Sequence, residues 1–316
     1  AVVFVINHRS NMDYVLVTYL AATAGTLSYA VGEWARVWPL SPIIRAMGAY
    51  FIRRRSRGNL YRKVLARYVQ MATRGGVSQA VFPEGGLSLN GLLAPPRMGL
   101  LNYIVDDFDP EVREVIFVPV AVNYDRVLED TILIAADKSG TRKFKPPLTG
   151  VLVRVARHVG LRLTGRFRGF GVASVSFGEP LELSKFNVDG ADDLTKQLAQ
   201  ELMRRIADVT PVVGVPLVAR HIMQAAPVQL SDLEAAVARS MTSLKERKLP
   251  CPRRSEGEVV EDALSRLRAR DLIVESDAGI TVTDTGQDIL TFYANSIAHH
   301  FDAGAANSDE ISAVAE

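Results

Sequence analysis

The chain has 316 residues, 48% of them hydrophobic, which is enough to bury a sizeable core in one large or two smaller domains. Its single cysteine, Cys251, excludes an internal disulfide, and no Cys/His spacing indicates a zinc site. The net charge of +2 is small, but basic residues gather at 53–67 and 154–168. Such clusters suit a bilayer surface, a phosphorylated substrate or nucleic acid, or simply form a solvated basic face.

The chain begins directly with the strand-like run 2–6, without a charged leader or cleavage site, so we interpret it as a fragment. A helix is expected to start near Ser10 and Asn11. The uncharged stretch 14–32 approaches the length of a membrane span, but its Thr, Ser and Gly residues favour a buried helix and loop.

Capping signals and hydrophobic periodicity predict the next elements. Ser41 is expected to cap a short helix, and residues 49–52 to form a strand. Residues 59–74 predict an amphipathic helix with Asn59 as its cap and Gly75 as its stop. The apolar face of this helix carries Leu60, Val64, Tyr68 and Met71.

Further strands are predicted at 77–82, 115–122 and 172–177, the last two rich in β-branched and aromatic residues. Apolar runs alternate with helix-period segments over residues 1–205, which predicts an α/β domain with a mixed sheet covered by helices. Residues 206–316 are expected to form a C-terminal, mainly helical region.

The helices expected near this boundary and beyond it are residues 192–209 and a segment opening with the capping-box pair Ser231 and Glu234. Residues 259–300 also fit a helix followed by a β-wing, which raises nucleic-acid binding as a rival interpretation. We expect no nucleic-acid partner, because acidic residues lie near the edges of that wing: Glu275, Asp277 and Asp284.

Histidine and aspartate stand five residues apart in the run Asn7–Asp13, where the first strand gives way to a helix. A histidine can take a proton near neutral pH, and a carboxylate on its other ring nitrogen fixes the tautomer. We therefore interpret His8 as a candidate base, in a turn that solvent reaches, and Asp13 as its partner. A surface histidine at a helix start is the alternative.

Three more blocks follow in the chain. A strand delivers Arg53 and Arg54, whose forked side chains match phosphate oxygens, although a plain basic loop is the alternative. The next strand ends at Pro83 and is followed by Glu84 and two glycines, whose backbone amides can approach an anion. The last strand contains Pro119, which we expect at a sheet edge or bulge.

In order and spacing, these blocks resemble the four sequence blocks of the glycerophospholipid acyltransferase superfamily. The F-I-R-R form of the second block is similar to the glycerol-3-phosphate acyltransferases of the large bacterial membrane-bound type. Two later segments agree: residues 175–180 resemble the strand leading to Gly-Glu-Pro in that group, and residues 291–299 resemble its Y-x-x-N-x-I-A-H helix.

The resemblance implies that His8 is the catalytic base and Asp13 its partner. It also implies that an acceptor pocket is lined by Arg53, Arg54, Glu84, Gly85 and Ser88, near Pro119. The implied reaction moves a fatty acyl group from acyl-CoA or acyl-acyl carrier protein to the sn-1 hydroxyl of glycerol 3-phosphate and gives lysophosphatidate. Dihydroxyacetone phosphate and lysophosphatidate are alternative acceptors. The resemblance implies no metal and no cofactor.

One departure from the group stands after the two glycines, where its members carry arginines. This chain has Leu87, Leu89 and Leu92 there. Either another cation compensates, the acceptor is bound weakly, or the activity is changed or lost. The cations that can compensate are Arg97, Arg142 and Lys143.

Because the expected product is a lipid, we expect the protein at a membrane lipid surface, on the cytoplasmic face of the bacterial inner membrane. Residues 14–29 and 211–218 are apolar candidates for that contact, and both equally fit a buried core.

Overall fold

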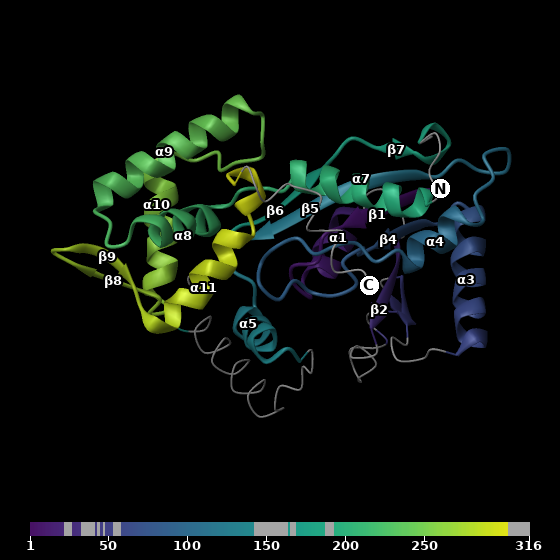
Figure 1. Cartoon of the computed structure of the whole chain (residues 1–316), viewed down its shortest axis with the longest axis horizontal. Coiled ribbons are helices and arrows are strands. Elements are labelled where there is room, and N and C mark those ends of the chain that lie inside the picture. Colours follow the sequence, from purple (N-terminus) through teal and green to yellow (C-terminus); the bar gives the residue numbers. More distant parts are fainter. Residues whose placement is uncertain are drawn as a thin grey trace.

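The computed structural model describes residues 1–21, 27–32, 42, 45–46, 48–52, 58–141, 164, 169–186 and 193–302. Its first part is a mixed sheet with helices on both faces, as the sequence predicts (Figure 1). The strands of this sheet are β1 (Val2–Ile6), β2 (Leu27–Gly32), β3 (Ala49–Ile52), β4 (Ser78–Val81), β5 (Ile116–Tyr124), β6 (Ala173–Phe177) and β7 (Leu181–Glu182).

The order of the strands is β3-β2-β4-β1-β5-β6, and β7 also pairs with β5. The first five strands of this order are parallel to one another, whereas β6 and β7 run antiparallel to β5. The carboxyl ends of β1, β4 and β5 therefore meet at one edge of the sheet, where polar side chains following each strand gather.

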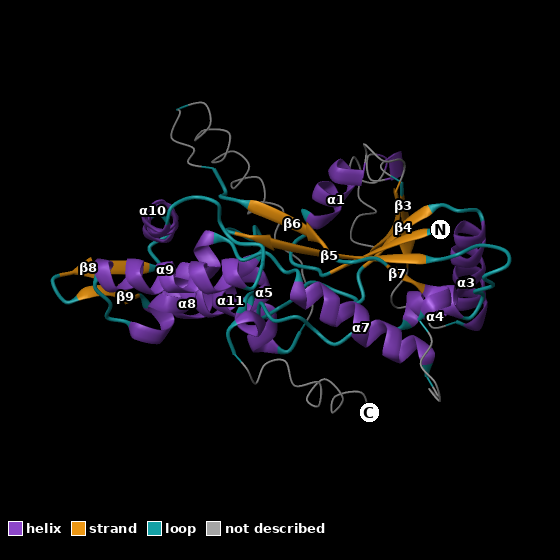
Figure 2. Cartoon of the chain, turned by 90° about the horizontal axis from the view of Figure 1, so that it is seen from above, coloured by secondary structure: helices purple, strands orange, loops and turns teal. Residues whose placement is uncertain are grey.

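Helices cover both faces of the sheet, as Figure 2 shows with α1 on one side and α4 and α7 on the other. Alternate residues of β1 serve the two sides: Val3 and Val5 pack with α4 and α7, whereas Ile6 belongs to the cluster that contains Tyr14 of α1. The helices of this part are α1 (Asp13–Ala21), α3 (Asn59–Arg74), α4 (Gly99–Val105), α5 (Asp130–Ser139) and α7 (Leu194–Asp208).

The C-terminal region is mainly helical, with one two-stranded hairpin. Its elements are α8 (Gly214–Ala225), α9 (Leu230–Glu246), α10 (Glu256–Arg268), β8 (Ile273–Ser276), β9 (Gly279–Val282), α11 (Asp284–Asn295) and a 3-10 turn at Ala298–His300. The α11 helix packs along α8 and reaches α5, and one apolar cluster runs from the sheet into these helices. Residues 211–218, one of the two apolar runs considered for membrane contact, lie almost wholly in that core.

Several local expectations are wrong in informative ways. The stretch 14–32 contains β2, which is stabilised by pairing with β3 and β4 on both sides despite its small and glycine residues. Gly58, not Asn59, is the N-cap of α3. α9 starts at Leu230 behind Gln229, so the Ser231–Glu234 pair lies inside the helix and not at its cap. The helix expected after Ser41 lies mostly outside the described residues.

Pro119 is not at an edge, because β5 is flanked by β1 on one side and by β6 and β7 on the other, but it does lie beside a bulge. Between the pairs Phe117↔Leu181 and Val120↔Phe177 the partner segment has one residue more than β5. The proline lies where the antiparallel partner of β5 changes from β6 to β7, and its carbonyl accepts a bond from Gly178 N. The N–H and C=O groups of one strand residue point to the same neighbouring strand. The N–H that Pro119 lacks would therefore face the interruption between β6 and β7, where no ladder hydrogen bond is lost.

Candidate active site

The run Asn7–Asp13, here called the histidine block, is held at the end of β1 by the Asn7 side chain, which continues the sheet. The Asn7 side chain donates to Val122 O (3.0 Å) and accepts from Val122 N (2.7 Å), so it pairs with β5 where β1 has ended. The chain then turns sharply, and Asp13 Oδ2 accepts from Arg9 N (2.7 Å) and Ser10 N (3.0 Å) before α1 begins. The turn is thus folded around the carboxylate.

His8 and Asp13 lie together as the spacing predicts. His8 Nδ1 lies 2.9 Å from Asp13 Oδ2, and the other carboxylate oxygen accepts from the Tyr124 hydroxyl at 2.6 Å. Burial and the negative charge of Asp13 hold the pKa of Tyr124 far above its ordinary value, so this hydroxyl stays protonated and donates. The arrangement leaves His8 Nε2 available for proton transfer.

Aromatic rings enclose the imidazole. Phe82 lies against it with ring centroids 4.3 Å apart, and the Tyr14 hydroxyl is 3.4 Å from His8 Nε2. His8 is only 3% exposed, so the expectation of a turn that solvent reaches is wrong: the ring is packed between β4 and α1.

Residues 83–88, here called the Glu84 block, contact the histidine block through hydrogen bonds to its main chain. Glu84 Oε1 accepts from His8 N at 2.9 Å, and Oε2 accepts from Ala94 N at 3.0 Å. Burial raises the pKa of this carboxyl, while the nearby Arg9 charge and the two amides oppose that shift. Ser88 N donates to His8 O (2.9 Å), and its hydroxyl donates to Leu92 O. Glu84 and Ser88 therefore hold the two blocks together, and their contact with an acceptor stays a prediction.

Gly85 has a left-handed backbone (φ 68°), and a Cβ there would lie 2.7 Å from Arg97 Cδ. The Arg97 side chain thus lies against Gly85. Three cations were considered as replacements for the missing arginines, and Arg97 is the one that lies within the described residues. Leu87 and Leu89 pack against the core from this loop. The other two candidates, Arg142 and Lys143, lie outside the described residues.

Arg53 and Arg54 also lie outside the described residues, just after β3. β3 is in the parallel part of the sheet, so its end at Ile52 points toward the same edge as the end of β1. Pro119 is buried within the sheet beside Val5, before the strand end that places Tyr124 against Asp13.

Sequence reasoning missed Glu129, which follows β5 and binds the next residues of the histidine block. Its carboxylate accepts from Ser10 Oγ (2.9 Å) and from Asn11 Nδ2 (2.9 Å). The adjacent Asp130 accepts from the Tyr293 hydroxyl of α11 at 2.8 Å and pairs with Arg270 at 2.7 Å. The loop behind the site is therefore tied to the C-terminal region.

Arg9 also connects the site to the C-terminal region. Its place between His8 and Asp13 could have suggested a role, but the sequence analysis assigned it none. It is buried, and its guanidinium donates to Gly91 O and to Ser296 O. Asn295 Nδ2 donates to Asn90 O at 2.9 Å. Gly91 has φ 89°, and a Cβ there would overlap the Phe292 carbonyl, so the loop needs glycine to approach α11.

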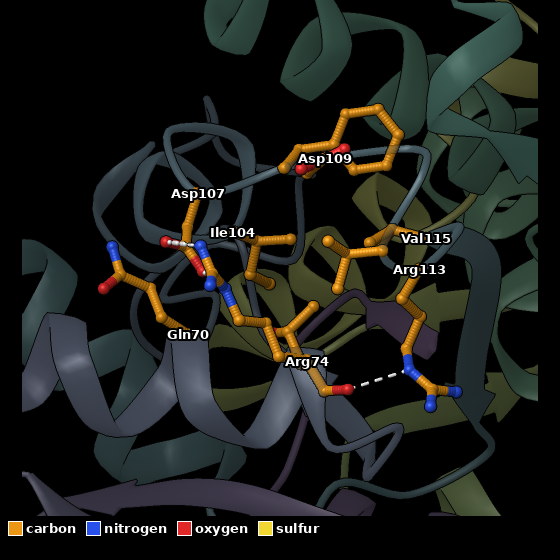
Figure 3. A pocket seen from close by; sticks show the side chains of 10 residues that line it. Gln70, Arg74, Ile104, Asp107, Asp109, Arg113 and Val115 are labelled. Atoms are coloured by element: carbon orange, nitrogen blue, oxygen red, sulfur yellow. Dashed lines mark hydrogen bonds and ion pairs between the residues drawn. The ribbon is translucent and has the colours of Figure 1, made fainter.

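The segment at residues 291–299 thus acts in this fold as an interface that docks the C-terminal region onto the loops of the site. A small pocket lies away from this site, near the ends of α3 and α4, and Arg74 and Asp107 are among the residues that line it (Figure 3). Among the described residues, every helix is either too short or too polar to span a bilayer.

Sequence comparison links both parts of the chain to known proteins. Residues 1–123 match the family model "Acyltransferase", and residues 161–306 match "Glycerol-3-phosphate acyltransferase C-terminal region". A glycerol-3-phosphate acyltransferase from Shewanella loihica is 32% identical over 247 residues, which cover 77% of this chain and 29% of that protein. One from Pseudoalteromonas atlantica is 28% identical over 331 residues, covering 95% of this chain and 39% of that protein.

The chain therefore spans only about a third of the length of these relatives. A 1-acyl-sn-glycerophosphate acyltransferase from Thermotoga maritima is a distant structural neighbour, with 19% identity, a TM-score of 0.37, and coverage of 64% of this chain and 63% of that one. Because both family models match here, in the order of the two structural parts, the chain belongs to the glycerol-3-phosphate acyltransferase family.

Proposed function

We propose that the protein transfers a fatty acyl group from an acyl thioester to the sn-1 hydroxyl of glycerol 3-phosphate, forming lysophosphatidate. The observation that carries the proposal is the buried His8–Asp13 pair at the carboxyl end of β1, clamped to the Glu84 block. Membership of the family supports glycerol 3-phosphate as the acceptor. The donor is acyl-CoA or acyl-acyl carrier protein, which present the same thioester.

In this mechanism His8 Nε2 takes the proton of the acceptor hydroxyl as its oxygen attacks the thioester carbonyl. The C–S bond then breaks, and the departing thiolate takes the proton from the imidazolium. Asp13 stabilises the imidazolium through Nδ1. Tyr14, whose hydroxyl is already near Nε2, lies beside the reacting atoms.

The acceptor phosphate requires cations, and we propose Arg53, Arg54 and Arg97 for this role. Arg97 is supported by its place against Gly85. The two other arginines are supported by the parallel direction of β3. We further propose that the reaction takes place at a membrane lipid surface, on the cytoplasmic face of the bacterial inner membrane, because the product is a lipid.

The test is to incubate the protein with labelled glycerol 3-phosphate and a long-chain acyl thioester, presented as acyl-CoA and as acyl-acyl carrier protein. Formation of labelled lysophosphatidate is the expected result. Dihydroxyacetone phosphate and lysophosphatidate are tested as acceptors in parallel. A preference for either of them would replace the acceptor, and turnover of none of the three would refute the proposed activity.

A further inference from the structure

The outward side of α3 carries a stripe of large apolar side chains in contact with solvent. Leu60, Val64, Tyr68 and Met71 are between 47% and 77% exposed. Their three- and four-residue spacing places them along one side of the helix. The apolar stripe of a surface helix ordinarily faces the core. Here the opposite side, with Val69, packs into the core. Within the stripe, Tyr68 contacts the Tyr50 ring of β3 with ring centroids 4.9 Å apart, and it is still 47% exposed. The other three side chains of the stripe face solvent.

The charges of α3 all have one sign. The helix contains four basic residues and no acidic one: Arg62, Lys63, Arg67 and Arg74. Arg74, at the end of the helix, is bound to Asp107 with 2.6 Å between Nε and Oδ2 (Figure 3). The other three are exposed, and no carboxylate of the described residues forms an ion pair with them.

The start of the stripe points toward the edge of the sheet that holds the site. α3 connects β3 to β4, which run in the same direction through their shared neighbour β2, so the helix runs back against the strands. Its first turn, with Leu60, therefore points toward the edge where β1 ends and His8 follows. Its last turn, at Arg74, points toward the opposite edge.

We propose that this surface, the α3 face, binds a bilayer that contains anionic lipid. The α3 face consists of Leu60, Val64, Tyr68 and Met71 with Lys63 and Arg67, which lie along one border of the stripe. An apolar stripe flanked by cations inserts its apolar side chains at the boundary of headgroups and acyl chains, while the cations meet anionic headgroups. A second copy of the chain fits less well, because a symmetric contact places the same cations opposite one another.

The proposal gives the membrane association in the proposed function a definite surface. It also orients the molecule, since the site edge of the sheet lies toward the first turn of the helix. Vesicle binding needs no catalysis, so the test stands whether or not the chain transfers acyl groups.

The experiment is flotation of the 316-residue chain with two kinds of vesicles, phosphatidylcholine alone and phosphatidylcholine mixed with phosphatidylglycerol. The apolar variant combines Leu60→Gln, Val64→Gln and Met71→Gln. The charge variant combines Lys63→Gln and Arg67→Gln. A matched control replaces three scattered apolar residues that are 46–57% exposed: Val112→Gln, Leu230→Gln and Val274→Gln.

We expect the apolar variant to bind both vesicles about a hundredfold more weakly, since three inserted side chains are lost. The charge variant is expected to lose about thirtyfold on anionic vesicles only, since each cation near such a surface contributes about fivefold. The scattered control is expected to bind like the parent, and all variants to melt like it.

Three results would overturn the proposal. The first is that the parent chain binds neither kind of vesicle, and the second is that the apolar variant binds as well as the parent. The third is a dimer of the parent, detected by light scattering, that the apolar variant does not form, because this would assign the α3 face to a second copy.

Discussion

Replacing Asp13 by asparagine separates the charge of this residue from its geometry. In the structure Asp13 Oδ2 accepts from His8 Nδ1, Arg9 N and Ser10 N, and Oδ1 accepts from the Tyr124 hydroxyl. In Asp13→Asn the amide oxygen can meet the first three donors. The amide nitrogen then faces the hydroxyl of Tyr124, which can turn and accept. We therefore expect the variant to fold with His8 in place.

The loss of charge is expected to be costly for catalysis. A unit charge about 4 Å from the imidazolium contributes about 4 kcal/mol at an effective dielectric constant of about 20. That corresponds to roughly a thousandfold lower kcat. The assay is steady-state formation of lysophosphatidate with both substrates saturating, with thermal unfolding as the control for the fold. Activity of folded Asp13→Asn within about tenfold of the parent would refute the role assigned to Asp13.

A second substitution tests whether the Tyr124 hydroxyl changes from donor to acceptor in Asp13→Asn. Tyr124→Phe added to Asp13→Asn leaves the buried amide nitrogen without its partner. We expect the double variant to lose about 1–3 kcal/mol of unfolding free energy relative to Asp13→Asn. An unchanged melting temperature would show that the hydroxyl does not accept from the amide.

Three further changes test the surroundings of the site. Arg97→Gln is expected to raise KM for glycerol 3-phosphate at least tenfold and to leave KM for the acyl donor unchanged, because charge-assisted contacts to the phosphate are lost. Arg113→Gln is the control, and equal effects of Arg97→Gln on both KM values would contradict the assignment. Asn295→Ala is expected to increase hydrogen exchange in residues 85–97, because the tie to that loop is lost; exchange equal to that of Thr291→Ala, on the same helix, would show that the tie does not hold the loop. Burial, followed by nearby positive charge, lowers the pKa of His299 to about 3 from 6.5, so folding excludes its proton and stability is lost as pH falls below 6.5. The free energy of unfolding should drop by about 2 kcal/mol from pH 7 to pH 5, and by less in His299→Gln; equal drops in denaturant titrations would contradict this.

The sheet was predictable from the sequence where a strand carries its own signal. The strands near 2–6, 49–52 and 115–122 combine β-branched or aromatic residues with clear ends, and the structure has them. β2 has small residues and two neighbouring strands, so its formation depends on pairing that a local pattern does not contain. The sequence also did not predict that the apolar side of α3 faces solvent, because periodicity defines an apolar stripe but not what the stripe contacts.

The site was predictable to a similar extent. Spacing along one turn brought His8 and Asp13 together, since both belong to a single strand-to-helix connection. Glu129 and Tyr124 reach the same turn from more than a hundred residues away, and isolated polar residues carry no mark of such a contact. The docking of Ser296 onto Arg9 depends on how the two parts of the chain pack, which only the structure contains.

In the proposed reaction, His8 removes the proton from the acceptor hydroxyl. The most direct measurement compares lysophosphatidate formation by the parent with that by His8→Ala and His8→Gln, each checked for parent-like unfolding and for binding of glycerol 3-phosphate. We expect both variants to bind the acceptor while kcat falls at least a hundredfold, the usual contribution of a general base. A folded His8→Ala protein that keeps kcat within about tenfold of the parent would exclude His8 as the base.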